Sequence, residues 1–175
     1  MIRTESIELI LRPAAPQDAI DVARVHVRSW QTAYRGLLPD VYLDQLRPED
    51  RAGRYDFATA DPSKPFTVVA VEEGRIRGFA TTAPARDADG PECGELFALY
   101  VDPERWRRGY GLALVAAARR RLAERGHCAA VLWMLEGNAR ADRFYRADGW
   151  APDGTRRTDT VWGIQVNEVR YRRAL

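Results

Sequence analysis

The residues best suited to chemistry form a turn rich in arginine and glycine, Arg107-Arg108-Gly109-Tyr110-Gly111-Leu112-Ala113. Before this turn lies an apolar run, which ends at Asp102-Pro103. After the turn, apolar residues recur at helical spacing. The first N–H groups of a helix lack intrahelical partners and carry partial positive charge. The two glycines leave those groups accessible, and the two arginines add fixed charge. This pattern predicts a site for an anion such as phosphate, with a solvated glycine turn as the alternative.

A second group of chemically capable residues begins at Asn138 and extends to residue 150. Asn138 suits the N-cap of a helix, and Phe144-Tyr145 follows within that helix. The phenol of tyrosine has a pKa of about 10, so Tyr145 is protonated at neutral pH and able to donate a proton. The alternative is a tyrosine that packs beneath the helix and bonds to the backbone.

These residues must be positioned by alternating strands and helices. Apolar patterns predict strands over residues 7–11, 66–71, 76–83, 95–101, 129–135, 155–162 and 166–173. Helical spacing predicts helices over residues 18–34, 41–46, 110–126 and 138–147, with the structure of residues 47–58 less defined. The order of these elements predicts an α+β domain whose mixed sheet is covered on both faces. A length of 175 residues suits one domain spanning residues 1–175.

Composition argues against several classes of protein. The net charge of +2 is too small to indicate a nucleic-acid-binding protein. No apolar run approaches the length of a membrane span, and the N-terminus lacks the apolar core of a signal peptide. Cys93 and Cys128 give no reason to expect a disulfide, so we expect a cytoplasmic protein. His26 and His127 lie far apart and no Cys/His cluster has zinc spacing, so we expect no metal.

The two segments together resemble the GCN5-related N-acetyltransferases, the GNAT family. Arg108-Gly109-Tyr110-Gly111-Leu112-Ala113 fits the family pattern Q/R-x-x-G-x-G/A, and residues 138–150 are similar to its element N-x-x-A-x-x-F-Y-x-x-x-G-F/W. The resemblance implies a mixed, mostly antiparallel sheet of about seven strands with about four helices, in three α/β/α layers. In that fold two central parallel strands splay apart. The resemblance also implies an acetyl-CoA-dependent N-acetyltransferase that works by direct attack in a ternary complex.

The resemblance assigns the cofactor to three segments. The pantetheine arm of acetyl-CoA would pair with the strand end as an added strand does, mainly through backbone groups. The pyrophosphate would lie on the turn described above, and the second segment would contact the pantetheine as well. The residues implied outside the turn are Leu99, Tyr100, Val101, Asn138, Phe144 and Tyr145.

The resemblance also implies catalytic and acceptor-binding residues. Tyr145 would be the general acid for the leaving thiolate, and Glu95 the general base, directly or through a water. The alternatives for Glu95 are a strand-end acid facing water and an amine that binds already neutral. The acceptor would lie between Trp30 and Tyr34 on one side and Trp162 on the other, near Glu95, although Trp30 as a core residue is nearly as favoured. Aromatic walls suit an apolar or cationic acceptor.

Several functional alternatives stay open at this point. The leading hypothesis is a small-molecule amine as acceptor, and a peptide or protein amine is the alternative. A domain that binds or senses acyl-CoA without catalysis would share the same fold. A homodimer through the C-terminal strands is a hypothesis that comes from the resemblance.

Overall fold

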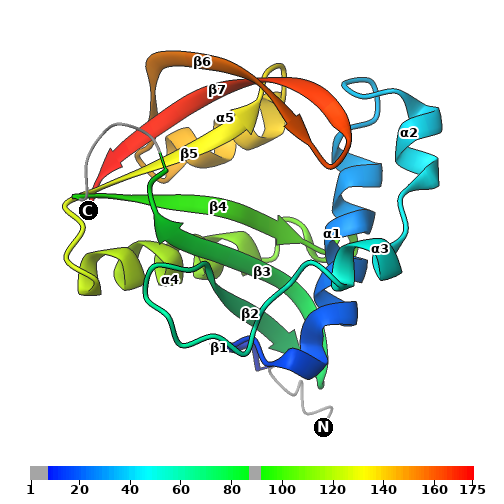
Figure 1. Ribbon diagram of the computed structural model, residues 1–175, viewed down its shortest axis with the longest axis horizontal. Coiled ribbons are helices and arrows are strands. Elements are labelled where there is room, and N and C mark those ends of the chain that lie inside the picture. Colours follow the sequence, from blue (N-terminus) through cyan, green and yellow to red (C-terminus); the bar gives the residue numbers. More distant parts are fainter. Residues whose placement is uncertain (1–7, 87–91) are drawn as a thin grey trace, which may run out of the picture.

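The computed structural model describes residues 8–86 and 92–175 (Figure 1). The strands are β1 (Ile10–Pro13), β2 (Phe66–Glu72), β3 (Arg75–Pro84), β4 (Cys93–Val101), β5 (Ala129–Leu135), β6 (Ala151–Val161) and β7 (Ile164–Ala174). The α-helices are α1 (Ala19–Ala33), α2 (Asp40–Gln45), α3 (Pro48–Ala52), α4 (Tyr110–Glu124) and α5 (Ala139–Ala147), and two 3₁₀ turns are η1 (Pro16–Asp18) and η2 (Pro103–Arg105).

The strands form one seven-stranded sheet in the order β1-β2-β3-β4-β5-β7-β6. Every neighbouring pair is antiparallel except β4 and β5, which run parallel. Helix α1 packs on one face, where Val22 and Val25 contact Val69 and Phe79. Helices α4 and α5 pack on the other face. The predicted α+β fold in three layers is therefore confirmed, with five α-helices among the described residues where about four were expected.

Local sequence accounts for most element boundaries. The hairpin between β2 and β3 turns on Glu73 and Gly74, which both have positive φ, at 49° and 72°. This two-residue geometry suits the twist of paired strands, and glycine adopts it without strain. The first strand begins at Ile10, later than the alternation predicted, because its pairing starts opposite Val71 near the end of β2. Residue 7 lies outside the described residues.

The parallel pair β4 and β5 separates soon after it begins. Pairing joins residues 93–95 to residues 129–131 and then stops. Each strand continues with its other neighbour, β4 with β3 as far as Val101 and β5 with β7 as far as Leu135. The two strands splay as the family resemblance implied, and the carboxyl-terminal half of β4 has an open side. Within residues 8–86 and 92–175, no helix combines the length and the apolar composition needed to span a membrane.

Candidate active site

A cavity of about 560 Å³ lies beside the open half of β4, and we call it the splay cavity. Its wall comes from the end of β4, the arginine-glycine turn before α4, and the middle of α5. Most of the predicted cofactor-binding residues line it: Leu99, Tyr100, Val101, Arg107, Gly109, Gly111, Leu112, Phe144 and Tyr145. Two segments far apart in the sequence therefore meet at one cavity.

The backbone of β4 presents hydrogen-bonding groups to this cavity. The N–H of Asp102 donates to the carbonyl of Arg77 on β3 at 2.7 Å. Because backbone groups alternate sides along a strand, those of Leu99 and Val101 point to the open side. The Val101 carbonyl accepts from Trp106 Nε1 at 2.8 Å and from Ser29 Oγ at 3.0 Å. The N–H groups of Leu99 and Val101 are thus directed at the splay cavity.

The arginine-glycine turn is bent so that α4 begins at the cavity wall. Gly109 is the N-cap of α4 and has a φ of +86°, and Arg107 also has a positive φ, of 61°. A Cβ at Gly109 would meet no atom within 4 Å, whereas one at Gly111 would lie 3.1 Å from Phe144 Cε2. Arg107 and Arg108 are exposed, and neither forms an ion pair with a residue in the described ranges. Two uncompensated positive charges therefore flank the first N–H groups of α4.

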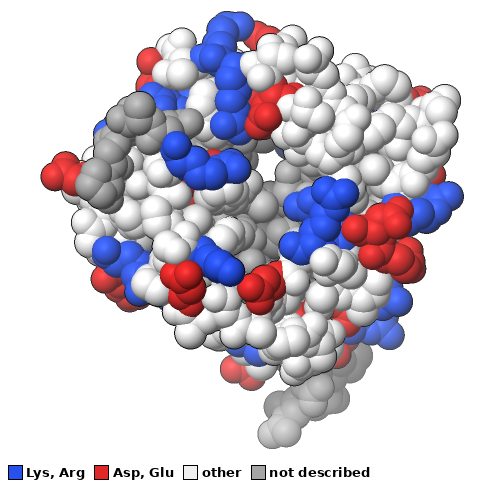
Figure 2. Space-filling model, viewed as in Figure 1, with Lys and Arg blue, Asp and Glu red and all other residues white. Residues whose placement is uncertain are grey.

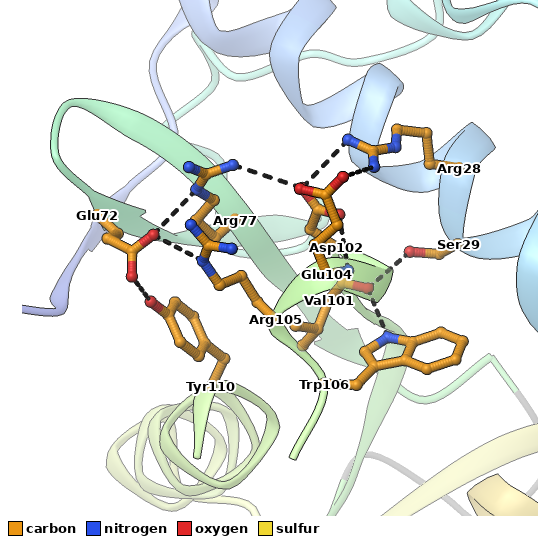
Figure 3. A network of polar contacts seen from close by, with 10 residues as sticks. All are labelled: Arg28, Ser29, Glu72, Arg77, Val101, Asp102, Glu104, Arg105, Trp106 and Tyr110. Atoms are coloured by element: carbon orange, nitrogen blue, oxygen red, sulfur yellow. Dashed lines mark hydrogen bonds and ion pairs between the residues drawn. The ribbon is translucent and has the colours of Figure 1, made fainter. Parts of the chain in front are cut away.

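A buried polar network holds this turn from beneath (Figure 3). Glu72, at the end of β2, is 3% exposed and accepts from the hydroxyl of Tyr110, the first residue of α4. It also accepts from Arg105 Nε at 2.7 Å, and Arg77 Nε lies 3.2 Å away. The hydrogen bond from Tyr110, then that from Arg105, lowers the pKa of Glu72. One carboxylate thus ties both ends of the turn to the sheet.

A second carboxylate continues the network toward α1. Asp102 is 3% exposed, and its side chain caps η2 by accepting from the N–H of Glu104 at 3.2 Å. Arg28 of α1 lies 3.3 Å from Asp102, and Arg77 lies 3.6 Å from it, so Arg77 bridges the two buried carboxylates. The end of β4 is therefore fixed against β3 and α1 together.

Tyr145 lines the splay cavity from α5 and is 9% exposed. Its hydroxyl makes no hydrogen bond with a described residue, so the geometry does not match a tyrosine tied to the backbone. Burial raises the pKa of Tyr145 above the ordinary value of a tyrosine, and the nearby Tyr100 hydroxyl adds to this rise. The phenol is therefore protonated at neutral pH and faces the cavity with a proton to donate.

A second cavity, of about 320 Å³, lies on the α1 side of β4, and we call it the aromatic cavity. Rings of His26, Trp30 and Trp162 meet in its wall, with Trp30 and Trp162 5.0 Å apart and edge to face. Tyr100 lines both cavities and stacks on His26 at 4.6 Å. Burial, then the charge of Arg51, holds the pKa of His26 well below its usual range, so this imidazole is neutral.

Two predicted acceptor residues lie outside the cavity walls. Tyr34 packs edge-on against Trp30, and its hydroxyl lies 3.4 Å from that of Tyr100, so it supports the wall from behind. Glu95 is 2% exposed, which excludes the alternative of an acid facing water. Its carboxylate accepts from the backbone N–H and the guanidinium of Arg86, at 3.5 and 3.3 Å. Trp30 and Trp162 line the aromatic cavity directly.

The remaining predicted cofactor residues lie near the splay cavity without lining it. The hydroxyl of Tyr110 donates to Glu72, and the side chain of Arg108 is exposed at the turn. Ala113 follows Leu112, which lines the cavity, in α4. Asn138 caps α5 as predicted, because its Oδ1 accepts from the N–H of Ala141 at 3.1 Å.

Sequence reasoning missed several residues of the splay-cavity wall. In the splay cavity these are Ser29, Arg105, Trp106, Arg140 and Ala141. The guanidinium of Arg140 lies over the ring of Trp106 at 3.6 Å. Trp106 directly precedes the turn and Arg140 lies inside the second motif, so proximity to the motifs could have identified both. Within the described ranges, no three His, Cys, Asp or Glu side chains gather closely enough to hold a metal ion.

The sequence is similar to known proteins over most of its length. The sequence model of the family described as "Acetyltransferase (GNAT) family" matches residues 26–150. An uncharacterized N-acetyltransferase of Bacillus subtilis, YuaI, is 31% identical over 160 residues, which cover 91% of this chain and 89% of that protein. A mycothiol acetyltransferase of Kocuria rhizophila is 36% identical over 130 residues, 73% of this chain but only 41% of that protein.

The fold is also similar to solved structures. The PaiA N-acetyltransferase of Thermoplasma acidophilum, solved in complex with coenzyme A, superposes with a TM-score of 0.72 at 16% sequence identity. The superposition covers 97% of this chain and all of that one, 100%. At this identity the likeness concerns the fold.

Proposed function

We propose a specific reaction for this chain, which belongs to the acetyltransferase (GNAT) family and is an acetyl-CoA-dependent N-acetyltransferase. The acetyl group passes to the primary amine of a small molecule by direct attack, while both substrates are bound. One observation carries this proposal: Tyr100 lines both the splay cavity and the aromatic cavity. A thioester in the first cavity and an amine in the second would therefore meet at the same point of β4.

The splay cavity fits the parts of acetyl-CoA in order. The pyrophosphate would accept hydrogen bonds from the first N–H groups of α4 and from Arg107 and Arg108, whose charges have no carboxylate partner in the described ranges. The pantetheine arm would pair with the backbone groups of Leu99 and Val101. The carbonyl oxygen of the thioester, which gains negative charge during attack, would then lie near N–H groups of β4.

The chemistry needs a neutral amine and a stabilised leaving group. The amine nitrogen attacks the thioester carbon and forms the C–N bond, and the C–S bond breaks. Tyr145 donates its proton to the departing sulfur, and the attacking nitrogen loses a proton to a water. The tyrosinate then takes a proton back from water, so the products are an amide and a free thiol and Tyr145 is restored. Glu95 stays a proposed base only through a water, because its carboxylate contacts Arg86 and lines neither cavity.

The size of the aromatic cavity supports a small acceptor. Its volume of about 320 Å³ lies at the lower end of the range for small-molecule sites. Peptide and protein amines are the alternative acceptors, and they need an extended groove in addition to this cavity.

Two measurements test the proposal. Calorimetry with acetyl-CoA, with ATP and NAD as controls, is expected to show selective binding of acetyl-CoA, and a panel of small primary amines is expected to release thiol. Binding without thiol release from any amine would support the silent acyl-CoA-binding domain instead.

The role of Tyr145 has its own test. Tyr145→Phe is expected to lower kcat by about 10²- to 10⁴-fold, the usual contribution of a general acid, with little change in acetyl-CoA affinity. Tyr171→Phe is the matched control, because Tyr171 is also buried and its hydroxyl donates to Asp142. Equal losses of kcat and affinity in Tyr145→Phe would refute the acid role.

A further inference from the structure

The aromatic cavity contains positive charge that the proposed reaction does not use. Arg51, the penultimate residue of α3, and Arg54, just beyond that helix, both line it. Neither forms an ion pair with a residue in the described ranges. Lys64, which also lines the cavity, lies 4.0 Å from Asp56, the carboxylate of the same wall. Two arginine charges therefore remain without an ion-pair partner in the described ranges, beside a cavity lined by aromatic rings together with threonine and aliphatic side chains.

The position of Arg51 is set by the rings around it. Its guanidinium lies 5.1 Å from the centroid of the Trp162 ring and 5.4 Å from that of Tyr55. The side chain is half-buried, and its Nε is buried without a hydrogen-bond partner in the described ranges. An arginine held by its apolar contacts with donors to spare is arranged to bind a planar anion.

The charge of Arg51 acts inside the cavity as well as at its mouth. It contributes to the lowered pKa of His26, which lies in the same wall. Figure 2 shows basic side chains on either side of a hollow in the middle of this face, next to α3, and an acidic side chain at the lower edge of the hollow. A cationic group entering here would meet repulsion, and Arg51 already lies by the ring faces that would attract it.

From this arrangement we propose that the acceptor is a primary amine that also carries an anionic group, such as a carboxylate. The anion binds Arg51, with Arg54 at the mouth, and the amine lies against Tyr100 at the thioester. The inference rests on the proposed function and replaces the apolar or cationic acceptor that the aromatic walls alone suggested. It assigns the substrate class to the aromatic cavity.

The activity test compares amines that differ only in charge. Glycine, phenylalanine and tryptophan are each offered as the free carboxylate and as the carboxamide. Arg51→Gln is expected to lower kcat/KM for the carboxylates by about 10- to 100-fold, the value of a hydrogen bond to a charged group, and to leave the carboxamides within about threefold. Arg51→Lys, which keeps the charge, should recover part of the loss. Arg24→Gln removes the same charge from the exposed face of α1 and should change neither series.

A binding test needs no turnover. Calorimetry on the protein saturated with coenzyme A compares 3-phenylpropanoate with 3-phenylpropanamide, and only the carboxylate is expected to bind, with its affinity lost in Arg51→Gln.

The outcomes separate this inference from the proposed function. Equal losses for carboxylates and carboxamides, or turnover of carboxamides alone, would overturn the anionic acceptor and leave the N-acetyltransferase proposal intact. Thiol release from no amine, together with no binding of the carboxylate probe, would overturn both.

Discussion

Replacement of the buried carboxylate of Glu72 tests how the phosphate-binding turn is held. Glu72→Gln keeps the shape of the side chain but removes the charge that faces Arg105 and Arg77. The hydroxyl of Tyr110 can still donate to the amide oxygen, whereas the amide nitrogen cannot accept from Arg105. The variant therefore leaves Arg105 half-buried without its counter-charge, whereas Arg77 keeps Asp102 at 3.6 Å.

The cost follows from these contacts. Breaking a buried ion pair by removing one partner costs about 3–5 kcal/mol of unfolding free energy, and the retained Tyr110 bond favours the lower value. About 3 kcal/mol corresponds to a Tm lower by about 6–12 °C for a chain of 175 residues. Binding of acetyl-CoA is expected to weaken as well, because the N–H groups of α4 are no longer held in place before the ligand arrives.

The pH dependence has a definite sign. The folded pKa of Glu72 is lowered, so its contribution to stability is complete above the unfolded pKa of about 4.3 and is lost as the pH falls through the lower folded value. The stability difference between wild type and Glu72→Gln should be constant above about pH 5 and should narrow below about pH 4.

Urea unfolding at several pH values measures the unfolding free energy, and calorimetry measures the affinity for acetyl-CoA. Glu104→Gln is the matched control, because Glu104 pairs with Arg28 at 3.0 Å in the same network but is exposed, so its loss should cost about 1 kcal/mol or less. Equal costs for Glu72→Gln and Glu104→Gln would show that burial of Glu72 does not anchor the turn.

Two further variants test the turn and the cap of α5. Gly109→Ala and Gly126→Ala each place an alanine in a left-handed backbone conformation with open space around the new Cβ, so each variant should lose about 1–2 kcal/mol of unfolding free energy. Only Gly109→Ala should weaken acetyl-CoA binding in calorimetry. Equal weakening in both variants would contradict the assignment of the turn. Asn138→Ala removes the acceptor of the Ala141 N–H and should cost about 1 kcal/mol of unfolding free energy, which lowers the Tm in scanning calorimetry by about 2–4 °C. An unchanged Tm would show that this cap does not stabilise α5.

Much of the fold could be predicted because local patterns are strong at its centre. Residues 129–135 form a continuous apolar run, and β5 has these bounds because both of its faces are covered. The cap at Asn138 and the turn before α4 follow from short-range chemistry, which a sequence displays directly. The two motifs of the splay cavity are also local, so they could be recognised in the sequence, whereas their meeting at the end of β4 was implied by the family resemblance.

The aromatic cavity could not be predicted in this way because its wall depends on a strand irregularity and on distant segments. Thr81 pairs with Ala98 but Thr82 pairs with Leu96, so β4 carries one extra residue, Phe97. A bulge of this kind breaks the alternation of side chains, and Phe97 and Ala98 both line the cavity. Glu95, which the family resemblance placed near the acceptor amine, pairs with Arg86 and lines neither cavity.

The cavity that contains Arg51 also bears on how the acceptor amine loses its proton. An ammonium has no lone pair with which to attack, so the amine must be neutral in the complex. Burial, then the charge of Arg51, holds the pKa of His26 well below its usual range, and an amine bound in the same cavity experiences the same two influences. Both disfavour the ammonium. A carboxylate bound to Arg51 would offset much of that charge, so burial is the influence that persists in the complex, and it reduces the need for a strong base at Glu95.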